Sequence, residues 1–320
     1  MAVLDAFDSD LDEVATRCSS DDAGVRRVAM LELADIPEPG AVPLLLAGLR
    51  DPDAAVREAA AKALDEHDGM AVVEALAAAL EDVERTVRAA AAESLAEKKV
   101  PGSAALLIER AGHAEPFVRT AALRALRELV APEAMPASLR ALNDPSADVR
   151  REAIGVLGYL KAEEALPALT AAASDVDASV RRAVMSALVF ARPGGPGASA
   201  LLAGLDDPHW QVREQAAASI GKVKMSEAIG PLIATMNDES WQVRAKAANS
   251  LGRICAVPAV PALGAALSHD VSNLRKEAAA ALGEIGDPTA LAFLEGAVGD
   301  PDPDVRKLVR WAIGRCQTTV

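Results

Sequence analysis

The chain has 320 residues, and its apolar fraction of 51% consists mainly of small side chains, because 71 residues are alanine and only eight are aromatic. This composition argues against an all-β sandwich or barrel, whose strands favour β-branched and aromatic residues, and against a disordered chain, which is poor in apolar residues. The net charge of −14 does not give the chain as a whole the basic footprint of a nucleic-acid-binding protein.

The N-terminal segment 1–19 is expected to form a capping helix, with apolar residues at helical spacing and acidic residues facing water. It lacks the basic stretch and the apolar stretch of a signal peptide. No run of about 18 apolar residues follows anywhere in the chain, so no membrane span is expected. The sequence therefore predicts a cytoplasmic protein without a membrane partner, and a monomer is the favoured oligomeric state.

Acidic residues are concentrated in the first third of the chain. Residues 1–100 carry 10 Lys or Arg and 22 Asp or Glu, whereas residues 101–320 carry 23 and 25. A solvated acidic face and a docking site for a basic partner are both open readings of this third. Three cysteines, Cys18, Cys255 and Cys316, lie too far apart for a disulfide framework or a zinc spacing.

A period of 31 residues organises the chain from residue 20 to residue 300 and beyond. An apolar residue followed by arginine recurs ten times, with spacings of 31 residues interrupted once by a spacing of 32. Such a fixed period is typical of repeat architectures. The ten dipeptides begin at Val25, Val56, Val87, Val118, Val149, Val180, Val212, Val243, Leu274 and Val305.

Each repeat is predicted to contain two helices. An aspartate five residues before the dipeptide, often followed by proline, is expected to cap the second helix, with the proline at its first position. Alanine four residues and leucine or isoleucine eight residues after the apolar residue give a buried stripe, as in Val243, Ala247 and Leu251. A glycine nine residues on, such as Gly221 or Gly252, is expected to end the helix.

The pattern Asp-Pro-x-x-x-Val-Arg-x-x-Ala-Ala-x-x-Leu-Gly resembles HEAT repeats, in the short bacterial form also seen in phycobilisome-lyase-like repeats. The resemblance covers nearly the whole chain. It implies an all-α fold, a right-handed α-solenoid of about ten 31-residue helix-turn-helix repeats, with the second helices lining the concave face. We expect one solenoid over 1–320, with stacked repeats in 20–300 and a C-terminal capping helix in 301–320.

The resemblance also implies that the repeated arginine and the repeated aspartate pair in a ladder along the array. Ser20, His113 and His269 replace the aspartate in repeats one, four and nine, so we expect a weaker ladder there. The expected ladder residues are Asp51, Arg57, Asp82, Arg88, Asp144, Arg150, Asp175, Arg181, Asp207, Arg213, Asp238, Arg244, Asp300 and Arg306.

The sequence offers no catalytic or metal-binding constellation. Its four histidines fall on different repeats, and no His-Glu dipeptide occurs, unlike in the HEAT-repeat hydroxylases of deoxyhypusine. Gly-x-Ser-x-Gly, Walker A and Cys-x-x-Cys motifs are also missing. We therefore expect a protein that is not an enzyme, with no catalytic residues, no metal and no cofactor.

The few aromatic residues gather on the second helices and mark a candidate binding surface on the concave face of repeats five to eight. Tyr159 and Phe190 share one repeat position, and Trp210 and Trp241 share another. Packing between repeats is the first interpretation of these residues, and a binding surface is the alternative, because aromatic residues beside arginine are enriched at interaction hot spots. The basic residues expected on the same surface are Arg151, Arg182, Lys222, Lys246 and Arg253.

Three functions follow from these features. The first is a non-catalytic protein–protein interaction scaffold, adaptor or assembly factor whose protein partner lies on the concave surface. The second, by resemblance, is an accessory subunit like those of the phycobilin lyases, assisting a covalent modification. The third is a HEAT-like nucleic-acid binder, which the net charge disfavours.

Overall fold

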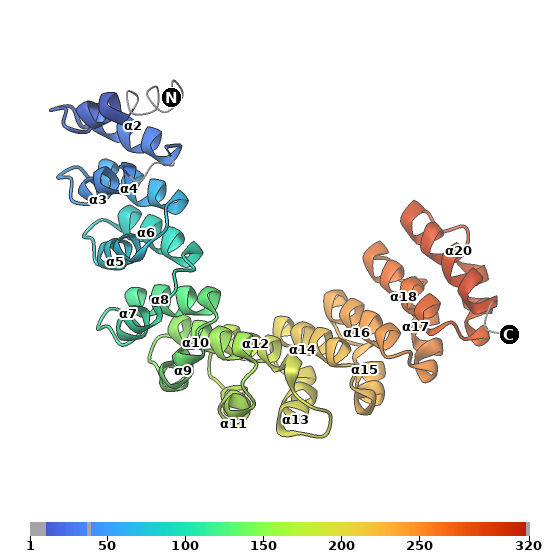
Figure 1. The fold of residues 1–320 in the computed structure, drawn as a ribbon. Helices are drawn as coiled ribbons and strands as arrows, with labels where there is room; N and C mark the ends of the chain where they lie inside the picture. Colours follow the sequence, from blue (N-terminus) through green and yellow to red (C-terminus); the bar gives the residue numbers. More distant parts are fainter. Residues whose placement is uncertain (1–10, 37–39, 318–320) are drawn as a thin grey trace. The chain divides into compact units, whose positions relative to one another are not determined.

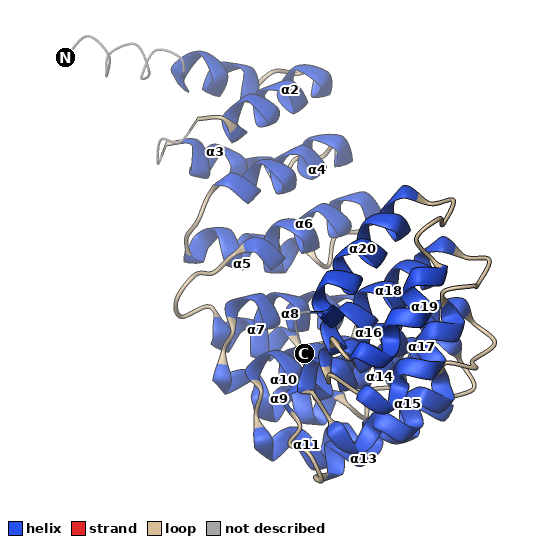
Figure 2. Cartoon of the chain, turned by 90° about the vertical axis from the view of Figure 1, so that its right-hand side faces the viewer, coloured by secondary structure: helices blue, strands red, loops and turns tan. Residues whose placement is uncertain are grey.

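The protein is an all-α solenoid in the computed structural model, which describes residues 11–36 and 40–317. Over these residues the chain alternates α-helices and short 3-10 helices, with no strand (Figure 2). The predicted fold class is thereby confirmed. The segment 1–10, which holds most of the predicted N-terminal cap, lies outside the described residues, and residues 11–18 are helical.

The chain divides into two compact halves, Met1–Leu160 and Lys161–Val320, with repeats one to five in the first and six to ten in the second. The second helices of the N-terminal half are α2 (Ala23–Ala34), α4 (Ala54–Ala63), α6 (Arg85–Glu97), α8 (Pro116–Leu129) and α10 (Ala147–Leu160). Its first helices are α3 (Ala41–Gly48), α5 (Met70–Ala79), α7 (Ala104–Arg110) and α9 (Met135–Ala141), with 3-10 helices η1 (Leu64–Glu66) and η2 (Pro132–Ala134).

The C-terminal half repeats this arrangement. Its second helices are α12 (Ala178–Ala187), α14 (Trp210–Val223), α16 (Trp241–Arg253), α18 (Ser272–Ile285) and α20 (Pro303–Gln317). Its first helices are α11 (Leu166–Ala172), α13 (Pro196–Ala203), α15 (Ile229–Thr235), α17 (Val260–Ala266) and α19 (Leu291–Gly296). The 3-10 helices are η3 (Glu163–Ala165), η4 (Leu188–Phe190), η5 (Gly204–Asp206), η6 (Ser226–Ala228), η7 (Val257–Ala259) and η8 (Pro288–Ala290).

Within each half the helices form two layers (Figure 1). Consecutive second helices pack side by side, and each first helix covers the second helix of its own repeat. The predicted apolar stripe lies between the layers: Val243, Ala247 and Leu251 are all fully buried. Alanine keeps this layer thin, because its small side chain lets neighbouring helices approach closely.

The repeated aspartate does not cap the second helix, in contrast to the sequence prediction. The N-cap of α4 is Asp53, whose carboxylate accepts N–H groups of the first helical turn. Asp51 lies two residues earlier and accepts the N–H of Asp53 at 2.8 Å. Pro52 therefore lies in the turn and not at the first helical position. Aspartate suits both roles, so the pattern identified the turn but set the start of the helix too early.

The repeated glycine does not end the second helix either. Gly221, Gly252 and Gly283 are buried inside α14, α16 and α18, where the next second helix approaches. A Cβ built on Gly252 would lie 2.7 Å from the Cα of Ala281 in α18. The helices end three residues later, at left-handed residues such as Lys224 with φ 53°. These glycines permit close helix packing, a role that local pattern cannot distinguish from capping.

Gly252→Ala is expected to lower the free energy of unfolding by about 1–3 kcal/mol, because the added methyl group must displace α18. Gly314→Ala is the matched control in α20, the last second helix, where an added Cβ meets nothing within 4 Å. That variant should be neutral or more stable by up to about 1 kcal/mol, since alanine favours helix more than glycine does. Urea midpoints by circular dichroism measure both, and equal effects would contradict the packing role.

Candidate partner-binding surface

Ion pairs between arginine and aspartate join neighbouring repeats along the solenoid. Arg57 donates from Nε to Asp82 Oδ2 at 2.7 Å and from Nη2 to Asp82 Oδ1 at 2.9 Å. The guanidinium and the carboxylate thus meet in a two-pronged pair, the strong geometry for these groups. Six such pairs are Arg26–Asp51, Arg57–Asp82, Arg119–Asp144, Arg181–Asp207, Arg213–Asp238 and Arg275–Asp300.

Each of these arginines also donates hydrogen bonds to backbone carbonyl oxygens in the turn of its own repeat. Arg57 donates from Nη1 to the carbonyl oxygens of Asp51 and Pro52, at 2.9 and 3.1 Å. The ladder arginine therefore spans two repeats, with its remaining donors used inside its own. Side chains so engaged are structural, and they do not form a basic surface for a partner.

The ladder lacks its carboxylate at the two positions where histidine replaces aspartate, His113 and His269. Arg88 faces the turn of His113, donates to the carbonyls of Asp82 and Val83, and lies 5.9 Å from the ring centroid of Phe117. Arg244 faces the turn of His269. Arg306 ends the array and donates to the carbonyls of its own turn.

Charge is segregated between the two helix layers of the C-terminal half. Its second helices carry thirteen Lys or Arg and four Asp or Glu, a net charge of +9. Its first helices contain no Lys or Arg, and Glu295 is their one charged residue. The balancing ladder aspartates, such as Asp207 and Asp238, lie in the turns. A protein of net charge −14 thus has one basic helix layer.

Four of the basic residues expected on the binding surface lie exposed on this layer: Arg182, Lys222, Lys246 and Arg253. None of the four makes an ion pair with another residue in the described part of the chain. The fifth, Arg151, lies on α10 in the N-terminal half and pairs with Asp148 at 2.7 Å. Below, we call the exposed side of α12, α14, α16, α18 and α20 the second-helix face.

The four aromatic residues expected on the surface lie at opposite ends of their helices. Trp210 and Trp241 are the first residues of α14 and α16 and are half-buried. Phe190 ends η4, after α12, and is also half-buried, whereas Tyr159 of α10 is 56% exposed. Twelve residues along a helix correspond to about 18 Å. A helical wheel places both positions on the outward side of the helix, but the tryptophans and Phe190 mark different edges of the layer.

A groove crosses the second-helix face at the C-terminal ends of its helices. It has a volume of about 570 Å³, and its lining comes from the ends of α14, α16, α18 and α20. Trp311, 45% exposed, forms one wall, and its ring lies against Gly283, where a Cβ would clash with it. The lining residues are Lys224, Asn249, Gly252, Arg253, Cys255, Glu284, Trp311 and Arg315.

The groove contains the predicted Arg253 but spans repeats seven to ten, so that half of it lies beyond the predicted repeats five to eight. Trp311 is the main residue that the sequence prediction missed. It stands six residues after Val305, a position expected to point away from the core, so the signal was present. Burial raises the pKa of the Glu284 carboxyl, against the opposing effect of Arg253. The groove therefore combines an aromatic wall, cations and one acid whose pKa is raised.

Metal-binding side chains do not cluster in the described part of the chain. No group of three or more His, Cys, Asp or Glu residues there could hold a metal ion. Cys18, Cys255 and Cys316 are free thiols. Among the described helices, none is both long and apolar enough to cross a membrane.

Comparison with known proteins identifies the repeat. A family model described as HEAT repeats matches residues 11–96, 73–139, 135–205, 198–272 and 256–314. No curated protein matches the chain.

Solved structures share the fold at low sequence identity. The Escherichia coli protein YibA is 20% identical, with a TM-score of 0.57 over 93% of this chain and 97% of that one. Yeast importin-β (Kap95p) is 16% identical, with a TM-score of 0.67 over 97% of this chain and 51% of that one. Kap95 in its complex with Nup1 gives 16% identity and a TM-score of 0.65, over 97% and 50% of the two chains. This chain therefore spans about half the length of importin-β.

The ladder makes stability depend on acid pH. Hydrogen bonding from Arg57 holds the pKa of Asp82 below its ordinary value of 3.8, and Arg26 and Arg275 do the same for Asp51 and Asp300. A carboxyl whose pKa is lower in the folded state stabilises the fold fully above its unfolded pKa, and the effect is lost as pH falls through the folded pKa. Urea midpoints should therefore drop as pH falls from about 5 to below 4.

Asp82→Asn should lower the free energy of unfolding at pH 6 by about 1–3 kcal/mol, because a charged hydrogen bond is lost. The variant should also show a shallower fall in acid. Asp206→Asn removes the same charge from an exposed aspartate that has no ion pair within the described residues. Denaturation curves at several pH values compare the two, and an equal loss in both variants would argue against the ladder.

Proposed function

The chain belongs to the HEAT-repeat family, and we propose that it is a non-catalytic interaction scaffold whose second-helix face binds an acidic segment of a protein partner. HEAT solenoids offer extended surfaces on which partners lie along several repeats. Kap95, a protein of similar fold, forms a complex with Nup1.

The unpaired cations of the second-helix face carry this proposal. Arg182, Lys222, Lys246 and Arg253 are exposed and come from three consecutive second helices, α12, α14 and α16. Long basic side chains without partners attract an acidic surface and speed its association. The ladder arginines that pair with aspartate in this half, Arg181, Arg213 and Arg275, add nothing to this surface, because their guanidinium groups are already paired.

The groove beside Arg253 adds an apolar contact to the electrostatic attraction of the exposed cations. Trp311 gives a large, partly exposed ring at its wall, and aromatic residues with arginine dominate the binding energy of many interfaces. An acidic segment with an apolar residue would place its charges on Lys246 and Arg253 and its apolar residue against Trp311.

The half-buried Trp210 and Trp241 remain part of the proposed surface, at the opposite edge of the layer. Their burial implies that truncation would weaken packing as well as binding. Tyr159 and Arg151 lie in the N-terminal half, and we propose a separate contact for them on the same layer of that half. Charge reversals of exposed cations are therefore the cleaner test.

Lys246→Glu and Arg253→Glu, made separately, should each weaken partner binding about tenfold or more, with unchanged helicity and melting temperature. Arg192→Glu is the matched control, since it reverses one charge at an exposed residue that pairs with Glu163 outside the second helices. The partner is first identified by affinity purification and mass spectrometry from a nuclease-treated lysate, and its dissociation constants are then measured by calorimetry.

Equal binding by all three variants would refute the assignment of this face. Loss of every captured protein on nuclease treatment would instead indicate a nucleic-acid partner, whose affinity should fall steeply with added salt.

A further inference from the structure

Arg244 differs from every other arginine of the repeat. The remaining nine donate to the carbonyl oxygens of their own turns, as Arg213 does to Asp207 at 2.9 Å. The Arg244 side chain makes no hydrogen bond to any described residue, and its Nε is buried without a partner. A buried donor left without an acceptor costs about 1–3 kcal/mol, so such an arginine calls for an explanation.

The missing acceptor is traced to His269. His269 occupies the repeat position of Asp238. One repeat earlier, the carboxylate of Asp238 pairs with Arg213. The His269 Nδ1 accepts the N–H of Val271 at 3.0 Å, so it makes the turn bond that an aspartate Oδ1 makes elsewhere. In the neutral ring the hydrogen then resides on Nε2. Arg244 and the Nε2 of His269 are therefore both hydrogen-bond donors, and neither can accept a hydrogen bond from the other.

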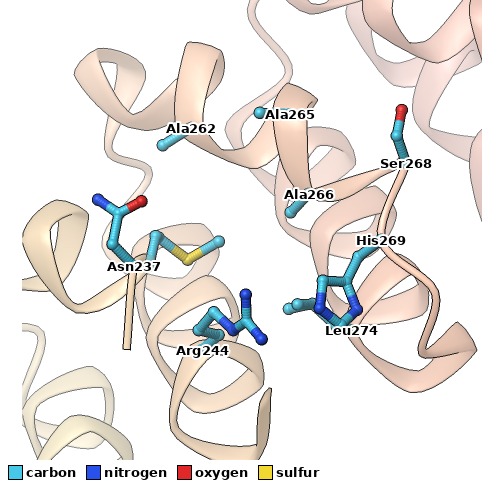
Figure 3. Close-up of a pocket in the computed structure, with 9 residues that line it drawn as sticks. Asn237, Arg244, Ala262, Ala265, Ala266, Ser268, His269 and Leu274 are labelled. Carbon is cyan, nitrogen blue, oxygen red and sulfur yellow. The ribbon is translucent and has the colours of Figure 1, made fainter. Parts of the chain in front are cut away.

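These two side chains line a cavity of about 320 Å³ at the end of α15 and along α17 (Figure 3). In the view of Figure 3 the Arg244 guanidinium lies between Asn237 on the left and the His269 ring on the right. The cavity lies on the first-helix side of the ladder and shares no lining residue with the groove of Trp311. Its lining includes no Asp or Glu: the other residues are Met236, Ala262, Ala265, Ala266, Ser268 and Leu274.

An equivalent cavity in the N-terminal half contains a carboxylate at the repeat position of His269. That cavity, of about 410 Å³, is lined by Arg119 and Asp144, which occupy the repeat positions of Arg244 and His269. Arg119 donates to the two oxygens of Asp144 at 2.7 and 2.8 Å. The same frame thus holds a carboxylate in one half and has none of its own in the other.

Histidine also interrupts the ladder at His113, and we call each such interruption a histidine break. The break at His113 is closed by neighbouring side chains. The Nε2 of His113 lies 3.3 Å from the carboxylate of Glu81, which also pairs with Arg110, and Phe117 covers Arg88. At the break of His269, the residues in the repeat positions of Glu81, Arg110 and Phe117 are Asn237, Ala266 and Asn273. Replacement of an acid, an arginine and a phenylalanine by smaller, uncharged residues leaves the second break open and without an anion.

We propose that the cavity of Arg244 and His269 binds a carboxylate group supplied by a ligand. The carboxylate would accept two hydrogen bonds from the Arg244 guanidinium, as the ladder aspartates do, and one from the His269 Nε2. The Asn237 amide can donate to a second polar group on the same ligand. Planar two-pronged recognition favours a carboxylate here, because six copies of this frame hold one. This site does not depend on the second-helix face.

The test titrates the full chain with succinate and with N-acetyl-aspartate methylamide, a blocked aspartate, while the Arg Nε–H signals are followed by NMR. Both probes should shift one Arg signal at constant ionic strength, and sodium chloride should not. Tighter binding of the blocked aspartate would identify an acidic protein side chain as the source, and tighter binding of succinate a free organic acid.

His269→Asp supplies the missing carboxylate from within the chain. This variant should raise the melting temperature and weaken binding of both probes at least tenfold. His113→Asp is the matched control at the closed break and should bind the probes as the unmodified chain does. No shift with either probe, or undiminished binding by His269→Asp, would overturn the proposal.

Discussion

The pair formed by the arginine of one repeat and the aspartate of the next is the contact on which the solenoid depends. In a repeat protein each unit touches only its neighbours, so order along the array must come from contacts of this short range. The guanidinium of Arg57 illustrates how one side chain suffices: it holds two carbonyls of its own turn and both carboxylate oxygens of Asp82. Such a pair fixes the spacing of successive turns, and with it the start of each second helix.

This ladder also accounts for the distribution of charge. The ladder aspartates lie in turns and the arginines at the starts of second helices, so the pairs neutralise one edge of the layer. Cations beyond that edge, such as Lys222, Lys246 and Arg253, form no ion pair within the described residues. A strongly acidic chain can therefore present a basic helix layer, and a whole-chain net charge does not describe its surface.

The 31-residue period was sufficient to predict the helix pairs and the buried stripe, and the resemblance to HEAT repeats implied the ladder, because all three features repeat within the chain. Features that involve the next repeat were not predictable in the same way. Gly252 reads locally as a helix end, yet its constraint is Ala281 in the following helix. Trp311 reads as one outward residue, yet it forms a groove with Glu284 and Arg253 of two other helices. Phe190 and Trp210 both fall on the outward side of a helical wheel, which carries no information on distance along the axis.

Whether a substitution at a repeat position leaves a polar group unpaired depends on the neighbouring side chains. His113 and His269 are the same substitution at the same repeat position, and the sequence gives no reason to treat them differently. Glu81 and Phe117 surround the first with an acid and a ring, so that its break is satisfied within the fold. Asn237 and Asn273 occupy those positions at the second, and Arg244 keeps a buried donor without an acceptor. In a solenoid of equivalent repeats, a substitution that leaves a buried hydrogen-bond donor unpaired marks a site where a ligand can supply the acceptor.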